Sequence, residues 1–204
     1  MRLYLVRHAA PEAWSAGRCI GRTDVPLSPV GRLEAEGLAA AFAGLDVAAV
    51  YATPLRRAAE TAAPIAAAVG REVTPCPGLA EIDFGAFEGR SRDEIARADP
   101  DLYARWTAAP EAVRFPAGES YADVRARAVP AVEDIARRHQ DGTAVAVAHA
   151  GPIRIVIAAA LDMPAAASFR LVVPHAAVAV LDWFGDLALV RGLDVLGGLR
   201  RVGR

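Results

Sequence analysis

The sequence of 204 residues contains no lysine, so all 23 of its basic residues are arginines. This absence excludes a P-loop, a Schiff-base or pyridoxal-phosphate site and a protein kinase, because each of these needs a lysine amine. A phosphate group would have to be bound by arginine, histidine and backbone N–H groups. Asparagine is also absent, glutamine occurs once and alanine occurs 47 times, a composition that indicates codon bias rather than function.

Cysteines and long apolar runs are scarce as well. Cys19 and Cys76 are too few and too far apart for a disulfide framework or a metal motif, although a bond between the two stays open. The first apolar run, residues 3–6, is too short for a signal peptide, and no stretch approaches the ~20 apolar residues of a membrane helix. We therefore expect a cytoplasmic location and no membrane contact.

The charges are nearly balanced, with 23 basic and 24 acidic residues and a net charge of −1. A hydrophobic content of 54% with 23% charged residues is typical of a folded globular protein. The small net charge argues against a nucleic-acid or membrane-surface partner. The length predicts one domain over residues 1–204, with residues 75–118 as a cap-like insertion over the sheet edge.

Short apolar runs alternate with amphipathic segments along the chain. The apolar runs predict strands at 3–6, 47–51, 72–74 and 144–148, and a closing hairpin of 178–183 and 187–190. Caps and apolar spacing predict helices from 29 to a stop at 44, at 54–69, 119–138 and 152–161, and one or two short helices within 91–108. This alternation predicts an α/β fold, a three-layer α/β/α sandwich with a mostly parallel central sheet.

Two of the predicted strands are followed closely by a histidine, His8 and His149. In open α/β sheets ligands bind beyond the carboxyl ends of the strands, so the pair favours a shared binding site over two structural histidines. Arg7 adjoins the first histidine. Arg56 and Arg57 begin a helix at the same edge, where helix N-termini favour anions; one of the two is expected to be a solvated surface group.

An unusual loop, residues 79–89, mixes three acids with apolar residues and glycines. A carboxylate held among apolar groups has a raised pKa and can act as an acid, which makes the acids of this loop candidates for that role. His175 precedes the closing hairpin, and it either lines the mouth of the pocket or is an ordinary partly exposed side chain.

Several segments carry a resemblance. Residues 6–9, Val-Arg-His-Ala, resemble the Arg-His-Gly signature of the histidine phosphatase (phosphoglycerate mutase-like) superfamily. Residues 53–62, 79–89, 116–120 and 147–154 are similar to its S-x-L-x-R-A-x-x-T-A, L-x-E…G-x-W-E-G, P-G-G-E-S and H-G-G-x-I-R segments, in family order. Ala9 and Ala150 replace family glycines. Both are small, so the backbone should still reach a phosphate unless a positive φ is needed there.

The resemblance implies a phosphomonoester hydrolase that needs no metal and no cofactor. His8 would be the nucleophile and form a phosphohistidine, and Glu81 would protonate the leaving alcohol. The phosphoryl group would be surrounded by Arg7, Arg57, His149 and the backbone at Ala150. The substrate would be a small phosphorylated metabolite, and the alternatives are phosphoglycerate mutase-type transfer or a non-catalytic phosphate-binding relative.

The segment 17–27 is similar to the G-x-C-Y-G-x-x-D-x-P-L segment of α-ribazole phosphatase-like members. This similarity suggests α-ribazole 5′-phosphate as a substrate. Arg22 in this segment either binds a second anionic group in the pocket or pairs with an acid. The apolar hairpin near 178–190 is a possible homodimer edge.

Overall fold

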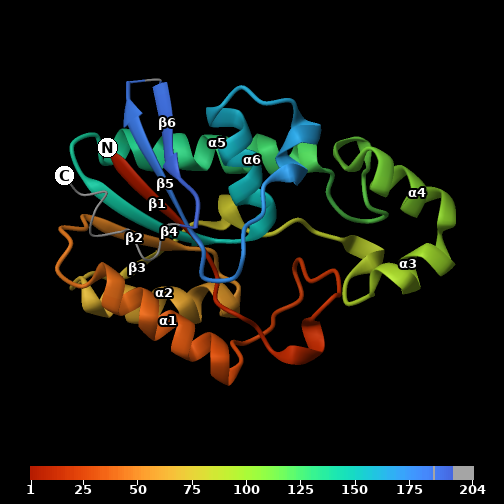
Figure 1. The fold of residues 1–204 in the computed structure, drawn as a ribbon, viewed down its shortest axis with the longest axis horizontal. Helices are drawn as coiled ribbons and strands as arrows, with labels where there is room; N and C mark the ends of the chain where they lie inside the picture. The colour runs from red at the N-terminus through yellow and green to blue at the C-terminus, as the bar shows by residue number, and fades with distance from the viewer. Residues whose placement is uncertain (186, 195–204) are drawn as a thin grey trace.

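The computed structural model describes residues 1–185 and 187–194 of the chain. Its centre is a six-stranded sheet with the order β3-β2-β4-β1-β5-β6 (Figure 1). The strands are β1 (Arg2–Arg7), β2 (Ala49–Ala52), β3 (Val73–Pro75), β4 (Thr143–Ala148), β5 (Val178–Phe184) and β6 (Leu187–Gly192). The first four are parallel, while β5 and β6 form the predicted antiparallel hairpin at one edge.

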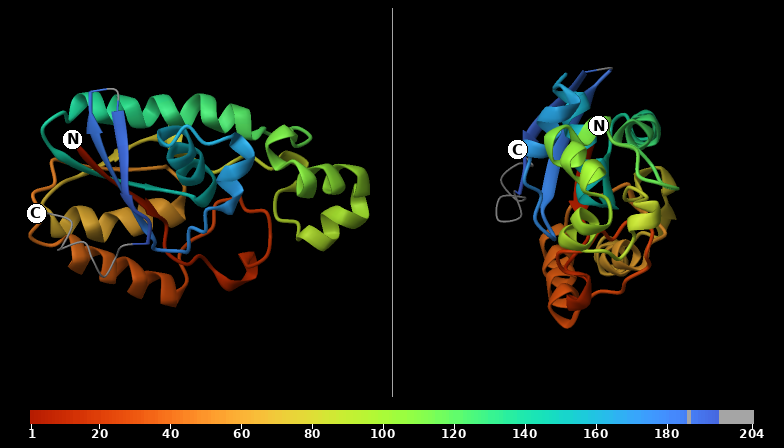
Figure 2. Two further views of the ribbon diagram at one scale, coloured as in Figure 1. Left: turned by 45° about the horizontal axis from the view of Figure 1, so that its top comes forward. Right: turned by 90° about the vertical axis from the view of Figure 1, so that its right-hand side faces the viewer.

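Helices cover both faces of the sheet. α1 (Pro29–Phe42) and α2 (Arg56–Ala68) lie on one face, and α5 (Tyr121–Arg138) and α6 (Ala150–Ala160) on the other (Figures 1 and 2). The alternation of side chains along β1 explains both layers. Tyr4 and Val6 pack into the core beneath α1 and α2, whereas Leu3 and Leu5 pack into the core beneath α5 and α6. The predicted α/β/α sandwich is confirmed.

Two short helices, α3 (Arg92–Ala98) and α4 (Pro100–Ala108), stand apart from the sheet at one end of the molecule (Figure 2). Asp99 separates the two helices. Its side chain accepts a hydrogen bond of 2.9 Å from the Leu102 N–H and so caps the start of α4. The predicted break at Pro100 is therefore present. Pro75, the first residue of the predicted insertion, belongs to β3 instead, and a cap role for the remainder stays a prediction.

Three helices begin two residues away from their predicted starts, and the first of them, α2, starts at Arg56 rather than Pro54, with Leu55 at the N-cap position. α6 starts at Ala150 rather than Pro152, because His149 is extended (φ −129°, ψ 168°) and takes the N-cap position. α5 starts at Tyr121 rather than Glu119, because Ser120 and Asp123 form a capping box. Glu119 therefore lies outside the helix, where its side chain can reach a neighbouring loop.

Cys19 and Cys76 are both free, buried thiols, so no bond joins them. Within the described part of the chain, no helix has the length and apolar character needed to cross a membrane.

Candidate active site

The two strand-end histidines lie side by side. Arg7 is the register partner of Ala148 in the parallel β1–β4 ladder, so the residues that follow, His8 and His149, leave the sheet together. The His8 N–H continues the ladder with a 2.9 Å bond to the Ala148 carbonyl. The ring centroids are 5.0 Å apart, and the two residues are only 5% and 0% exposed.

His8 is held in one orientation by its own backbone. Its Nδ1 lies 2.8 Å from the Ala9 carbonyl, which can only accept, so Nδ1 carries the proton and Nε2 has a free lone pair. The pKa of His8 lies well below 6.5, chiefly because of burial and then because of the charge of Arg57. A buried, neutral imidazole with one free nitrogen is a competent nucleophile.

His149 is also neutral, its pKa lowered well below 6.5 chiefly by burial and further by the charges of Arg57 and Arg7. Its Nε2 lies 2.8 Å from the Thr53 hydroxyl, and Thr53 directly follows β2, the neighbour of β4. Its Nδ1 is buried and has no hydrogen-bond partner among the described residues. Thr53 is therefore a site residue that the strand-end rule could have found.

Arg7 is fixed by the segment that leads into β5. Its Nη1 donates to the Val173 carbonyl at 2.6 Å, and its Nη2 lies 2.9 Å from His175 Nε2. The Nε of Arg7 is buried without a partner among the described residues, like Nδ1 of His149. Buried polar groups that lack partners are rare, and two of them at one site point to an anion that the free chain does not supply.

Arg57, the second residue of α2, is 1% exposed despite its charge. Its guanidinium donates to the Thr23 carbonyl at 2.9 Å and to the Gly21 carbonyl at 2.7 Å. Arg56 instead pairs with Glu60 at 3.1 Å on the surface. The structure thus places Arg57 at the site and leaves Arg56 as the solvated member of the pair.

Glu81 reaches the site from the loop before α3. Its Oε1 accepts from the Ile82 N–H at 3.0 Å, and its Oε2 accepts from the Gly151 N–H at 3.3 Å at the start of α6. A side chain at position 151 would collide with the Glu81 carboxylate, so this close approach requires glycine.

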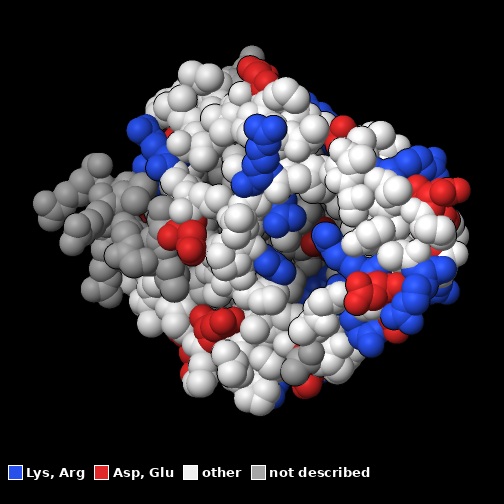
Figure 3. Space-filling view, turned by 45° about the vertical axis from the view of Figure 1, so that its right-hand side comes forward, with Lys and Arg blue, Asp and Glu red and all other residues white. Residues whose placement is uncertain are grey.

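A cavity of about 570 Å³ at the carboxyl end of the parallel strands is lined by Arg7, His8, Arg57 and Glu81, whereas His149 and Thr53 lie outside its lining. On the face in Figure 3, basic groups surround a hollow in the surface. Five arginines line the cavity, against the acids Glu12 and Glu81. Aromatic side chains form part of the wall: Phe84, Trp106 and Tyr121. A larger cavity of about 930 Å³ lies at the opposite ends of β1 and β4, near Arg2 and Asp182, which bind each other at 2.7 Å.

The two alanines that replace family glycines fit without strain. Neither Ala9 nor Ala150 is among the residues with positive φ. The Ala9 N–H is already bonded to the Thr61 hydroxyl at 3.0 Å, whereas Ala150 lines the cavity at the first position of α6. The described residues hold no group of three or more His, Cys, Asp or Glu side chains placed for a metal ion.

Of the two remaining predicted residues, His175 lines the cavity and Arg22 does not. His175 lines the cavity, its ring 5.3 Å from that of His8, and burial with the Arg7 and Arg57 charges lowers its pKa to about 4. Arg22 is not part of the cavity lining, and its Nη2 lies 3.6 Å from Glu119 Oε1. Of the two expectations for Arg22, pairing with an acid is the one that the structure contains.

Glu88 was not singled out from the sequence, although it organises the loop beside Arg57. Its carboxylate accepts from the N–H groups of Gly21, Arg22 and Thr23 at 2.9–3.1 Å. Although burial acts to raise the pKa of Glu88, hydrogen bonds from Thr23 and its neighbours lower it. The loop at residues 21–23 thus donates its N–H groups to Glu88 and accepts hydrogen bonds from Arg57 at its carbonyls.

Comparisons with known proteins agree with this geometry. The chain is 37% identical over 201 residues to an acid phosphatase of Mycobacterium tuberculosis, covering 96% of this chain and 92% of that protein. It is 35% identical over 163 residues to phosphoserine phosphatase 1 of Hydrogenobacter thermophilus, covering 80% and 77%. It spans about half the length, 51%, of other curated relatives, among them a bifunctional protein of M. tuberculosis.

Among solved structures, an Escherichia coli protein provisionally named an alpha-ribazole-5′-P phosphatase matches with a TM-score of 0.87 and 25% identity, covering 95% and 96% of the two chains. The family model of the histidine phosphatase superfamily (branch 1) matches residues 3–194, which include every site residue described above. This chain belongs to the histidine phosphatase superfamily.

Proposed function

We propose that this protein is a phosphomonoester hydrolase that works through a phosphohistidine at His8 and needs no metal ion. The observation that carries the proposal is the neutral His8 ring, which is fixed through Nδ1 and lines one cavity with Arg7 and the buried Arg57. Arginine suits such a site because its planar fork binds phosphate oxygens two at a time.

In the first step, Nε2 of His8 attacks phosphorus and forms an N–P bond while the ester P–O bond breaks. Glu81, in its protonated form, gives its proton to the leaving alcohol oxygen. Charge on the phosphoryl oxygens is met by Arg7, Arg57 and His149, and the unpaired buried nitrogens of Arg7 and His149 support this placement. The N–H groups at the start of α6, beginning with Ala150, favour the same anion.

In the second step, the ionised Glu81 takes a proton from water, and the water oxygen attacks phosphorus. The N–P bond breaks and inorganic phosphate leaves, which returns His8 and Glu81 to their starting states. The position of Glu81 supports both tasks, since its carboxylate lines the cavity beside the start of α6.

The phosphoenzyme is the direct test. With a labelled phosphate ester and a rapid alkaline quench, we expect an acid-labile, base-stable label on the wild-type chain and none on His8→Ala. Hydrolysis by a folded His8→Ala protein, or a label that survives acid, would reject the proposal. Binding of phosphate without any turnover by the wild type would identify a non-catalytic relative instead.

For the substrate, we propose α-ribazole 5′-phosphate as the first ester to test. The aromatic wall of Phe84, Trp106 and Tyr121 suits a flat ring, and the E. coli neighbour carries the same provisional assignment. The test is hydrolysis of this ester against ribose 5-phosphate, which lacks the aromatic base. Equal specificity constants would remove the aromatic base from recognition.

A carboxylated ester is the second candidate, because Arg154 lines the cavity without a carboxylate partner among the described residues. Its Nε donates to the Leu171 carbonyl at 2.8 Å, which leaves the rest of the guanidinium available. The named activity of the H. thermophilus relative supports phosphoserine. Phosphoserine should then be hydrolysed with a higher specificity constant than phosphoethanolamine, and Arg154→Gln should abolish that preference.

The mutase alternative is tested with phosphoglycerates. Phosphoryl transfer between phosphoglycerates that is faster than their hydrolysis would favour it.

A further inference from the structure

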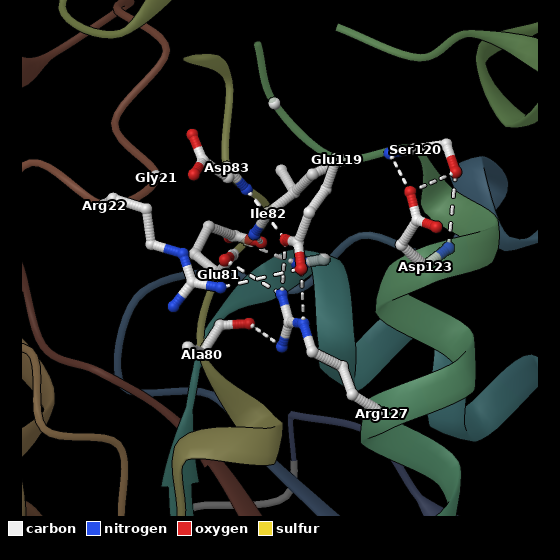
Figure 4. A network of polar contacts seen from close by, with 12 residues as sticks. Gly21, Arg22, Ala80, Glu81, Ile82, Asp83, Glu119, Ser120, Asp123 and Arg127 are labelled. Atoms are coloured by element: carbon white, nitrogen blue, oxygen red, sulfur yellow. Dashed lines mark hydrogen bonds and ion pairs between the residues drawn. The ribbon is translucent and has the colours of Figure 1, made fainter.

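A polar network lies beside the loop that carries Glu81 and outside the cavity lining (Figure 4). Its centre is Arg127 on α5. Nη1 of Arg127 donates to the carbonyls of Gly78 and Ala80 at 2.8 and 2.6 Å, and Nη2 donates to the carbonyl of Glu81 itself at 3.0 Å. One guanidinium therefore binds three backbone carbonyls, two before Glu81 and one at Glu81.

Glu119 binds both Arg127 and the loop that carries Glu81. Its two oxygens accept from Nε and Nη2 of Arg127 at 2.9 and 2.8 Å, a two-point ion pair whose side chains are both only 20% exposed. Glu119 Oε2 also accepts from the Asp83 N–H at 3.0 Å, and the Glu119 N–H donates to the Asp83 carbonyl at 2.9 Å. The pair thus binds the loop before, at and after Glu81.

Besides this pair, the loop is held by the buried side chains of Ala80 and Ile82 and by a 3.1 Å bond from the Phe84 N–H to Glu88. Residues 80–84 lie outside regular secondary structure, between short 3-10 turns at Pro77–Leu79 and Gly85–Phe87. The Glu81 carboxylate itself has two backbone partners, Ile82 and Gly151, among the described residues. Because a proton donor must be within about 3 Å of its acceptor, a small movement of this backbone would remove Glu81 from reach.

We propose that Glu119 and Arg127 are positioning residues that hold Glu81 for proton transfer to the leaving group and from water. This inference rests on the proposed function of Glu81. Neither side chain lines the cavity, so neither is assigned a contact with substrate. Loss of the pair should therefore impair proton transfer while leaving nucleophilic attack and phosphate binding largely intact.

The test compares Glu119→Gln and Arg127→Lys on two esters. With an alkyl phosphate, whose leaving group needs a proton, we expect phosphoenzyme formation in single turnovers to slow roughly tenfold to hundredfold. With p-nitrophenyl phosphate, whose leaving group needs little protonation, phosphoenzyme formation in single turnovers should fall less than about threefold, with KM nearly unchanged. Equal losses on both esters, or no loss on either, would overturn the inference.

A matched control is Arg114→Gln, which removes an exposed ion pair with Asp123 beside the same helix start. The other bond of the Arg114 side chain goes to the Gly118 carbonyl at 3.2 Å, and among the described residues this side chain makes no hydrogen bond to residues 78–83. We expect this variant to match the wild type on both esters. Thermal unfolding of each variant shows whether it is folded, and Glu119→Gln, which keeps the shape of the side chain, decides the question if Arg127→Lys does not fold.

Glu81→Gln separates the two proposals. If Glu81→Gln slows phosphoenzyme formation equally with both esters, the acid role fails, and with it the proposed function of Glu81. If Glu81→Gln is selective for the alkyl ester but the pair variants are not, the positioning role alone fails. In the double variant Glu81→Gln/Glu119→Gln, we expect no further loss beyond Glu81→Gln, because a positioning residue has nothing left to position.

Discussion

His8 and Glu81 line one cavity from regions that are built differently. His8 and His149 follow adjacent parallel strands, and the β1–β4 ladder fixes their spacing through backbone hydrogen bonds. Glu81 lies in an irregular loop, whose backbone is held by the side chains of Glu119 and Arg127. One half of the site is set by the sheet, and the other half by a few polar side chains.

The difference matters because ladder bonds are made by any sequence that forms the sheet, whereas the loop needs particular residues. Changes near the histidines should therefore affect the phosphoryl step on every ester. Changes near Glu81 should affect proton transfer, and so they should depend on the leaving group.

Among variants that retain the nucleophile, Arg57→Gln should give the largest effect. It removes a buried cation from the proposed phosphate site, and loss of one preorganised donor costs about 100-fold to 1,000-fold in rate. Because this step precedes any choice of leaving group, kcat/KM should fall equally for alkyl and p-nitrophenyl phosphates.

Arg56→Gln is the matched control, since it changes the adjacent arginine, which is exposed and paired with Glu60. We expect it to stay within about twofold of the wild type, as exposed ion pairs contribute little. Similar losses in the two variants would contradict the placement of Arg57 at the phosphoryl group.

Gly151→Ala should give the next largest effect, a slower phosphoenzyme formation in single turnovers that is confined to the alkyl ester. The added methyl group would collide with the Glu81 carboxylate, and displacement by about 1 Å can cost on the order of 100-fold. The control is Gly37→Ala in α1, where the added carbon meets no atom within 4 Å and alanine favours the helix. An equal loss on both esters would mean that the substitution disturbs α6 rather than Glu81.

The sheet-borne half could be predicted from the sequence. Apolar runs locate β1 and β4, and the residues at their ends, His8 and His149, meet because parallel strands end at one edge. The choice of Arg57 over Arg56 came from the family resemblance, and the structure places Arg57 as expected. The predicted start of a helix at Glu119 was wrong by two residues.

The loop-borne half could not be predicted in the same way. The Glu119–Arg127 pair joins residues 78–83 to positions about 40 residues further along the chain, and no periodic pattern marks such a contact. Arg22 illustrates the same limit, since its sequence neighbourhood allowed both a pocket role and an acid partner. Arg22 and Glu119 are far apart in the sequence, and only the tertiary fold brings their side chains to within 3.6 Å of each other.

The smallest effect concerns the pH dependence of stability, which should differ between variants of the sheet-borne half and variants of the loop-borne half. Burial holds the pKa values of His8 and His149 well below 6.5, so below about pH 6.5 the unfolded state binds more protons and stability falls as pH falls. Each such histidine contributes up to about 1.4 kcal/mol per pH unit. In urea unfolding of His8→Gln, the free energy of unfolding should therefore change less steeply with pH between pH 6.5 and 5 than in the wild type.

The pKa of Glu119 is lowered despite burial, by Arg127 and the Asp83 N–H. The stability that ionised Glu119 contributes is therefore lost only as pH falls below about 4.5. Glu119→Gln should leave the slope between pH 6.5 and 5 unchanged, and a change there would contradict this division between the halves.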